Sequence, residues 1–87
     1  MAWTVEFSKI AVSQFSKFDK PTKKRIKGFI TKLAMLHNPR HNGKFMQGEY
    51  SAYYRYRVGD YRLICHIEDN AMLITVIKMG HRKDVYK

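Results

Sequence analysis

The chain has 87 residues and a mass of 10.3 kDa, which allows a single domain spanning residues 1–87 and leaves no room for a second one. Hydrophobic residues make up 45% of the sequence, so the chain can bury a small core and is not a disordered tail. No apolar run approaches the roughly 18 residues of a membrane-spanning helix. The one cysteine, Cys65, excludes an internal disulfide and a cysteine-based zinc site. We therefore expect a reduced, cytoplasmic domain with no metal and no cofactor.

The charge is strongly positive. Seventeen Lys and Arg residues against seven Asp and Glu residues give a net charge of +10 and an isoelectric point near 10.0. Such an excess costs self-repulsion in a small body and favours association with polyanions, so nucleic acid or the ribosome is the leading class of partner. A membrane surface is disfavoured because the basic residues are not confined to one amphipathic helix.

The first half of the chain predicts a strand followed by two helices. Apolar and polar residues alternate over residues 3–7, as in a strand. Ser8 is suited to cap a helix over Lys9–Phe18. Pro21 suits the first position of a second helix, which Asn38-Pro39 ends. The positions expected to face inward are Ala11, Val12, Phe15 and Phe18 in the first helix and Ile26, Ile30, Leu33 and Leu36 in the second.

The second half predicts a three-stranded antiparallel meander. Residues 37–48 are expected to form a loop, apart from a short extended piece at Phe45-Met46. Gly59-Asp60 and Asp69-Asn70 are suitable two-residue hairpin turns. The predicted strands are Tyr50–Val58, Tyr61–Glu68 and Ala71–Met79. With both helices on one face of this sheet and the other face open, the fold class is a two-layer α+β domain.

Two-residue turns fix which side chains share a face of the sheet. Val58 is expected opposite Tyr61, Arg57 opposite Arg62, Arg55 opposite Ile64 and Tyr53 opposite His66. In the second hairpin the expected pairs are Ile67 with Met72, Cys65 with Ile74 and Leu63 with Val76. The face under the helices then gathers Tyr54, Tyr56, Leu63, Cys65, Ile67, Met72, Ile74 and Val76. The open face carries Ser51, Tyr53, Arg55, Arg57, Arg62, Ile64, His66, Leu73, Thr75 and Ile77.

Arginines are expected to converge on this open face. Like charges directly opposite each other destabilise a sheet by up to about 1 kcal/mol. The predicted pairing of Arg57 with Arg62 would carry this cost. Gly80-His81-Arg82 should emerge beside them. Because guanidinium groups match phosphate oxygens, we interpret the set as a phosphate site, with an ordinary solvated basic face as the alternative.

The second helix carries a further basic run. Lysines in its first turn, such as Lys23 and Lys24, oppose the helix dipole and so do not serve helix stability. The run is either a docking surface for an RNA backbone or an ordinary solvated face. Its members are Lys20, Lys23, Lys24, Arg25, Lys27 and Lys32.

The segment Tyr54–Leu63, followed by Met79–Tyr86, resembles the RelE/ParE superfamily of bacterial toxins, and the RelE branch in particular. The shared motifs are a basic-x-basic pair, Tyr-Arg, Gly-x-Arg and a terminal Val-Tyr. The resemblance implies a ribosome-dependent, metal-independent endoribonuclease that cuts mRNA in the A site of the 30S subunit by attack of the 2′-hydroxyl on the adjacent phosphate. It also implies a RelB-like antitoxin that blocks this face, with operator DNA bound only through the antitoxin complex.

Matching positions with the RelE motifs implies a role for each site residue. Arg55 and Arg57 occupy the basic-x-basic pair, which in the best-known RelE toxins consists of lysines. Arginine, with a pKa above about 12, is a poor general base, so His81 or His66 becomes a candidate for proton transfer. The expected catalytic residues are Arg55, Arg57, Arg62, Arg82, Tyr86 and His81. The expected RNA-binding residues are Tyr53, His66, Lys23, Lys24 and Lys27.

Two other functions stay open at this point. A ParE-like toxin would use the same fold to inhibit DNA gyrase without cutting RNA, and a basic RNA- or ribosome-binding protein would lack catalysis. The convergence of Arg, Tyr and His residues favours the ribonuclease, because a gyrase inhibitor does not need convergent phosphate ligands. We also expect an antitoxin segment with acidic and apolar residues to cover an apolar strip formed by Ile64, Leu73 and Ile77.

Overall fold

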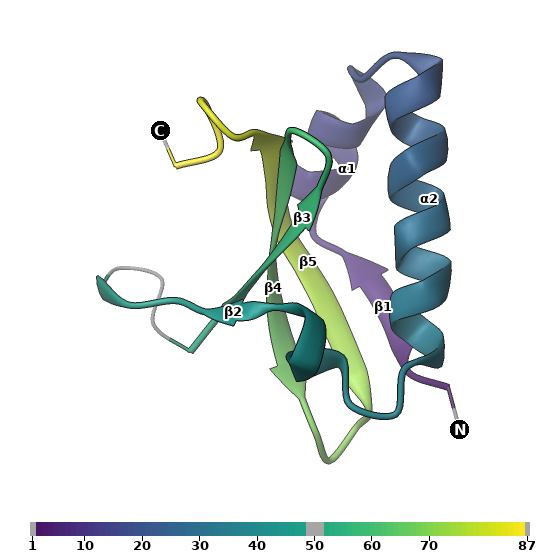
Figure 1. Ribbon diagram of the computed structural model, residues 1–87, viewed down its shortest axis with the longest axis vertical. Helices are drawn as coiled ribbons and strands as arrows, with labels where there is room; N and C mark the ends of the chain where they lie inside the picture. The colour runs from purple at the N-terminus through teal and green to yellow at the C-terminus, as the bar shows by residue number, and fades with distance from the viewer. Residues whose placement is uncertain (1, 49–51, 87) are drawn as a thin grey trace.

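The computed structural model describes residues 2–48 and 52–86. A five-stranded sheet carries both α-helices on one face, and the C-terminal segment lies on the other side (Figure 1). The elements in chain order are β1 (Thr4–Phe7), α1 (Lys9–Ser16), α2 (Lys20–Met35), a 3-10 helix η1 (Pro39–Asn42), β2 (Lys44–Phe45), β3 (Tyr54–Val58), β4 (Tyr61–Glu68) and β5 (Leu73–His81). The predicted two-layer α+β class is confirmed. Within the described ranges, no helix is long and apolar enough to cross a membrane.

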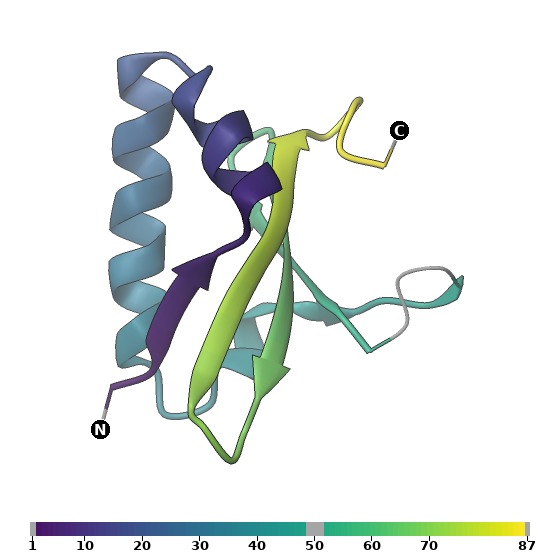
Figure 2. The same ribbon diagram turned by 180° about the vertical axis from the view of Figure 1, so that it is seen from behind.

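The strands lie in the order β1-β5-β4-β3-β2. β3, β4 and β5 form the predicted antiparallel meander, β2 extends it at one edge, and β1 pairs with β5 in parallel at the other. Seen from behind, β1 runs alongside β5 beneath the helices (Figure 2). The N-terminal strand thereby ties the start of the chain to its last strand.

Side-chain caps start both helices, at Ser8 as predicted and at Asp19, which the sequence analysis did not single out as a cap. The Ser8 hydroxyl accepts a hydrogen bond from the Ala11 backbone N–H at 3.0 Å, and the Asp19 carboxylate accepts one from the Thr22 N–H at 3.0 Å. Pro21 is the second residue of α2, because the helix begins one residue earlier than predicted. α1 ends at Ser16, two residues earlier than predicted.

The hydrophobic core lies between the helices and the sheet. Its members come from all the larger elements: Trp3, Ala11, Ile26, Leu33, Tyr56, Leu63, Cys65, Ile67, Ile74, Val76 and Met79. Val12, predicted to face inward, is 55% exposed because it lies at the rim of a groove between α1 and α2 rather than over the sheet. The buried Tyr56 hydroxyl donates to the Pro39 carbonyl at 2.8 Å and so fixes the chain that follows α2.

The first hairpin has the predicted register. Val58 pairs with Tyr61, Arg57 with Arg62 and Arg55 with Ile64, and Gly59 adopts the positive φ of 60° that this tight turn requires. The strand is shorter than predicted, because β3 begins at Tyr54. Tyr53 is not paired with His66 in the ladder, although their rings meet edge to face with centroids 6.0 Å apart. Tyr50 and Ser51, predicted to start the strand, lie outside the described residues.

The second hairpin has a longer turn than predicted. Glu68 pairs with Leu73 and Ile67 with Ile74, so the connection consists of residues 69–72 and the predicted pair of Ile67 with Met72 is wrong, as is that of Cys65 with Ile74. A two-residue hairpin turn of type I′ needs positive φ at both central residues. Asp69 and Asn70 adopt positive φ less readily than a pair that contains glycine. The chain instead closes through the Met72 N–H, which donates to the Asp69 carbonyl at 3.0 Å, with positive φ at Met72 alone. The observed β4–β5 pairing differs from the predicted one by two residues, and a shift of two by itself leaves a side chain on its predicted face. Ile67 and Ile74 therefore stay in the core.

A β-bulge interrupts β5 at Ile77. Cys65 pairs with Val76 but Ile64 pairs with Lys78, which leaves Ile77 as the extra residue. The predicted pair of Leu63 with Val76 is therefore wrong, and Leu63 lies opposite Met79. The bulge reverses the alternation of β5, so that Met79 enters the core while Lys78 and Gly80 turn to the face away from the helices.

Candidate functional site

The sheet face away from the helices, called here the open face, carries an arginine pair near the tip of the β3–β4 hairpin. Arg57 and Arg62 lie directly opposite each other, and their chain neighbours Tyr56 and Leu63 point into the core. The Arg57 side chain is exposed. Arg62 is half-buried and its Nη1 donates to the carbonyls of Tyr61 and Gly59 at 3.1 and 3.3 Å. Two guanidinium groups thus share one face at the hairpin tip.

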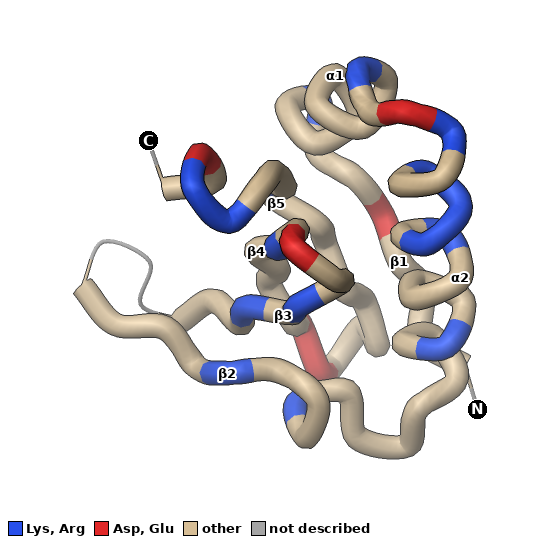
Figure 3. Tube along the Cα trace, turned by 45° about the horizontal axis from the view of Figure 1, so that its top comes forward, with Lys and Arg blue, Asp and Glu red and all other residues tan. Residues whose placement is uncertain are grey.

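The C-terminal turn brings a third arginine to this tip. The Arg82 N–H donates to the Asp60 carbonyl at 2.8 Å, which extends the pairing of β5 beyond the end of the strand. The chain then turns back on itself, because the N–H groups of Asp84 and Val85 both donate to the His81 carbonyl, at 2.8 and 3.0 Å. Basic residues of β3, β4 and this turn lie near one another at the same end of the sheet (Figure 3).

Val85 anchors the turn on the open face. It is 2% exposed, and a Cβ added to Gly80 would lie 3.6 to 3.8 Å from it. Ile64, also on the open face, is completely buried. Ile64 was predicted to belong to a strip available to a partner, and that expectation is wrong because the chain itself already covers it.

Tyr86 of the C-terminal turn and Arg55 of β3 are in contact on the open face. Arg55 Nη1 donates to the Tyr86 hydroxyl oxygen at 3.3 Å, while 41% of Tyr86 remains exposed. The Arg55 Nε is buried and has no hydrogen-bond partner among the described residues. The structure therefore brings Arg55, Arg57 and Arg62 to one face, with Arg82 and Tyr86 beside them on the C-terminal turn. We call these five residues the arginine cluster.

His81 does not join the arginine cluster. It pairs with Tyr61, and the two rings lie edge to face with centroids 5.6 Å apart. The Tyr61 ring in turn packs against Phe18, just after α1, with centroids 4.9 Å apart. The expectation that His81 emerges among the arginines is wrong, because the bulge at Ile77 turns this position toward the helices. The His81 Nδ1 also accepts a hydrogen bond from the Lys83 N–H at 3.2 Å.

The other predicted RNA-binding residues lie farther away. His66 is on the open face but four residues along β4 from Arg62, a distance of about 13 Å at the usual rise per residue, and Tyr53 lies beside it. Lys23 and Lys27 lie on α2, with their ammonium groups 5.9 and 6.0 Å from the Phe15 ring centre. Lys24 is an exposed residue of the same helix.

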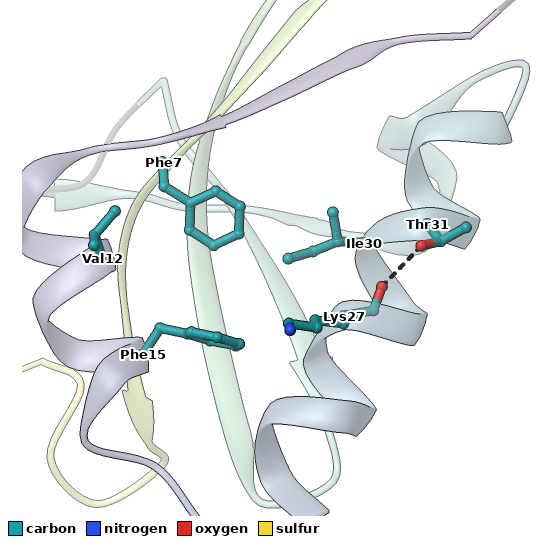
Figure 4. A pocket seen from close by; sticks show the side chains of 6 residues that line it. All are labelled: Phe7, Val12, Phe15, Lys27, Ile30 and Thr31. Carbon is teal, nitrogen blue, oxygen red and sulfur yellow. Dashed lines mark hydrogen bonds between the residues drawn. The ribbon is translucent and has the colours of Figure 1, made fainter. Parts of the chain in front are cut away.

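The lysines of α2 border a separate, mostly apolar groove. This groove, of about 460 Å³, lies between α1, α2 and β1 and is lined by Phe7, Val12, Phe15, Lys27, Ile30 and Thr31 (Figure 4). Since α2 packs on the opposite face of the sheet, the structure does not bring these lysines together with the arginine cluster.

Two cations on the open face were missed by the sequence analysis. Lys78 lies opposite Ile64, and Lys44 of β2 lies opposite Arg55. The sequence did contain a sign of the Lys78 position. Strict alternation from Ile74 and Val76 would place Lys78 in the core, and a lysine at a core position indicates a bulge. Across residues 2–48 and 52–86, no three His, Cys, Asp or Glu side chains gather as a metal site would require.

Solved toxin structures share this fold. A chain of the RelBE2 toxin-antitoxin complex from Mycobacterium tuberculosis is 25% identical, with a TM-score of 0.73 over 94% of this chain and 100% of that one. A chain of the RelE-RelB complex from Pyrococcus horikoshii is 24% identical, with a TM-score of 0.78 over 98% and 100%. A chain of the RelB-RelE complex from Methanococcus jannaschii is 26% identical, with a TM-score of 0.69 over 93% and 94%. The fold is that of toxins of the RelE/ParE superfamily, as the sequence motifs predicted.

Comparison of the sequence with family profiles assigns the chain to a family of toxins. The family profile described as the ParE toxin of the type II toxin-antitoxin system parDE matches residues 5–86. The chain belongs to this family and is the toxin of a type II toxin-antitoxin system. No curated protein matches the sequence.

Proposed function

We propose that this toxin is a metal-independent endoribonuclease that cuts mRNA in the A site of the ribosome. The observation that carries the proposal is the direct pairing of Arg57 with Arg62 on the open face, with Arg82 held beside them. Two like charges placed opposite each other destabilise the sheet unless an anion lies between or above them. A phosphodiester is such an anion, and guanidinium groups bind its oxygens in pairs.

The proposed reaction is an internal transesterification. The RNA 2′-hydroxyl loses its proton and attacks the adjacent phosphorus, the bond to the 5′-oxygen breaks, and that oxygen takes up a proton. The products are a 2′,3′-cyclic phosphate and a 5′-hydroxyl. Negative charge develops on the phosphate oxygens in the transition state, where Arg57, Arg62 and Arg82 stabilise it. The exposed ring of Tyr86, held through its hydroxyl by Arg55, is suited to stack on a nucleotide base.

Proton transfer is the step for which this face is least equipped. Arginine stays protonated at neutral pH. His81 lies on the other face, and its Nδ1 already accepts the Lys83 N–H, so a neutral ring carries its proton on Nε2 and offers no lone pair there. His66 is about 13 Å along the strand from Arg62. We therefore propose that the ribosome orients the 2′-hydroxyl and the phosphate and so supplies much of the rate enhancement.

The proposed partners follow from the family and from the charge. The relatives of known structure named above come from complexes with RelB antitoxins. We propose a RelB-like antitoxin for this toxin, with acidic side chains that bind the arginine cluster, and contact with operator DNA through the complex of the two proteins. Action on the ribosome places the toxin in the cytoplasm.

Cleavage of mRNA on purified, programmed ribosomes tests the proposal. The wild type should cut at defined positions in the A site, and the cut ends should carry a cyclic phosphate and a 5′-hydroxyl. Arg62→Ala and Arg82→Ala should each lower the rate by about 10²–10³-fold, in line with the loss of one transition-state donor. Lys9→Ala, at an exposed position at the start of α1, is the matched control and should cut at the wild-type rate.

Failure to cut would favour one of two other functions. The family profile is named after ParE, so inhibition of DNA supercoiling by added toxin, without RNA cleavage, would assign it to the gyrase-inhibiting branch. Binding to ribosomes without cleavage or gyrase inhibition would indicate a non-catalytic ribosome-binding protein.

A further inference from the structure

We propose that His81 is a positioning residue for Arg82. Its ring accepts the backbone N–H of Lys83 and so closes the C-terminal turn, and this contact, rather than proton transfer, is its contribution to cleavage. The inference rests on the proposed ribonuclease function. It gives a role to a histidine that the proposed reaction itself does not use.

Hydrogen bonds hold the backbone on both sides of Arg82. Its own N–H donates to the Asp60 carbonyl at the hairpin tip, 2.8 Å away. The N–H groups of the three residues that follow all donate to His81: that of Lys83 to the ring Nδ1 at 3.2 Å, and the next two to the carbonyl at 2.8 and 3.0 Å. Arg82 is therefore fixed to the hairpin by one contact and to the turn by three that end on the residue before it.

Packing fixes the orientation of the His81 ring. His81 lies opposite Tyr61 in the sheet, and the ring centroids are 5.6 Å apart, edge to face. The Tyr61 ring is itself packed against Phe18, with centroids 4.9 Å apart. Because a change of side-chain rotamer would break this contact, the His81 Nδ1 stays directed at the Lys83 N–H. A neutral ring then carries its proton on Nε2.

The contact is of the kind that starts a helical turn. There a side-chain acceptor, usually that of Asn, Asp or Ser, takes the N–H of the second or third residue along the chain. Arg82 and Lys83 are exposed and gain little stability from burial, so the turn depends on such hydrogen bonds. Without the acceptor, the Lys83 N–H turns to water and the backbone at Arg82 is free to move. A displacement of about 1 Å at a group that binds the reacting phosphate can cost about 10²-fold in rate.

Two substitutions of His81 separate the hydrogen bond from the ring. His81→Phe keeps a ring against Tyr61 and removes the acceptor, whereas His81→Asn removes the ring and keeps an acceptor for the N–H two residues on. His37→Phe, at an exposed position after α2, is the matched control. We expect single-turnover cleavage of ribosome-bound mRNA to fall about tenfold or more in His81→Phe, to stay within about threefold in His81→Asn and to be unchanged in the control. Thermal unfolding of each variant establishes that it folds, and nitrogen NMR of the wild-type ring needs no variant: a proton on Nδ1 of the neutral ring would refute the contact.

The cleavage assay can also overturn the inference. If His81→Asn is as inactive as His81→Phe, His81 acts through its ring or transfers a proton, and if His81→Phe cuts at the wild-type rate, the hydrogen bond does not matter. In the Arg82→Ala background, His81→Phe should cost at most about threefold further, because the side chain that it positions is absent. An undiminished loss of about tenfold in that background shows that His81 does not act through Arg82 and refutes the positioning role.

RNA binding separates a failure of the inference from a failure of the proposed function. If the wild type does not cut, the proposed function is wrong, and the salt dependence of binding to a single-stranded RNA oligonucleotide then decides about His81. Loss of one phosphate contact lowers the slope of log K against log salt by about 0.7. Arg82→Ala and His81→Phe should both show this loss, while His81→Asn keeps the wild-type slope. A wild-type slope in His81→Phe, or a lowered slope in His81→Asn, refutes the inference.

Discussion

The hydrogen bond between Gln14 and the bulge is the most informative contact to remove. The Met79 N–H lies in a residue that is 1% exposed, and the Gln14 Oε1 accepts it at 2.6 Å. Gln14→Ala leaves this N–H buried without a partner, which costs about 1–3 kcal/mol. In a domain of this size, 1 kcal/mol lowers the melting temperature by about 4–8 °C. We therefore expect Gln14→Ala to melt at least about 4 °C below the wild type.

Urea denaturation and thermal melting measure this effect. Gln14→Glu keeps an oxygen acceptor at the same position and should retain most of the stability, whereas Gln47→Ala, at an exposed position, should leave it unchanged. A Gln14→Ala variant that unfolds at the same urea concentration as the wild type would refute the idea that α1 stabilises the bulge. Gln14→Ala also tests whether Gln14 fixes the face of the sheet on which Lys78 lies, because a slip of the β5 register by one residue moves Lys78 to the other face.

Three further predictions concern charge and burial. Arg57→Thr should stabilise the protein by about 0.2–1 kcal/mol in urea denaturation, because it removes the repulsion from Arg62, while Arg57→Lys should not. Burial raises the pKa of the Cys65 thiol to about 12, so an aromatic disulfide reagent at pH 8 should label Cys65 only when the protein unfolds. Arg40 donates to both Asp69 carboxylate oxygens at 2.7 and 2.8 Å and lowers the pKa of Asp69 below 3.8. Asp69→Asn should therefore be less stable than the wild type at pH 6, and the difference should vanish as the pH falls through the lowered pKa.

The parts of the fold that follow local rules could be predicted from the sequence. Ser8 and Asp19 begin the two helices because their short side chains accept a backbone N–H, which depends on the next three residues alone. Gly59 fixes the first hairpin because it takes positive φ without strain. The opposition of Arg57 and Arg62 then follows from counting residues, which is why the centre of the candidate site was found.

The parts that depend on contacts between distant segments could not be predicted in this way. The bulge at Ile77 forms where α1 supplies an acceptor for the Met79 N–H, from a residue 65 positions earlier. Its consequences reach the site: Lys78 turns to the open face and His81 turns away from it. Ile64 was expected to be exposed because strand alternation does not reveal what the folded chain packs on a face of the sheet, as the C-terminal turn does where Val85 lies against Gly80.

The two faces of the sheet contribute to stability with opposite signs near Arg57 and Arg62. The core residues under Arg57 and Arg62 supply apolar burial, while the arginines themselves repel each other across the same strands. Any anion that binds the cluster relieves this repulsion, whether it is an RNA phosphate or a carboxylate of the proposed antitoxin. Because both ligands would draw on the same guanidinium groups, their binding is mutually exclusive, and the relief of repulsion contributes to the affinity of each. Neutralising Arg57 should therefore weaken the binding of RNA and of antitoxin together while it stabilises the unliganded toxin.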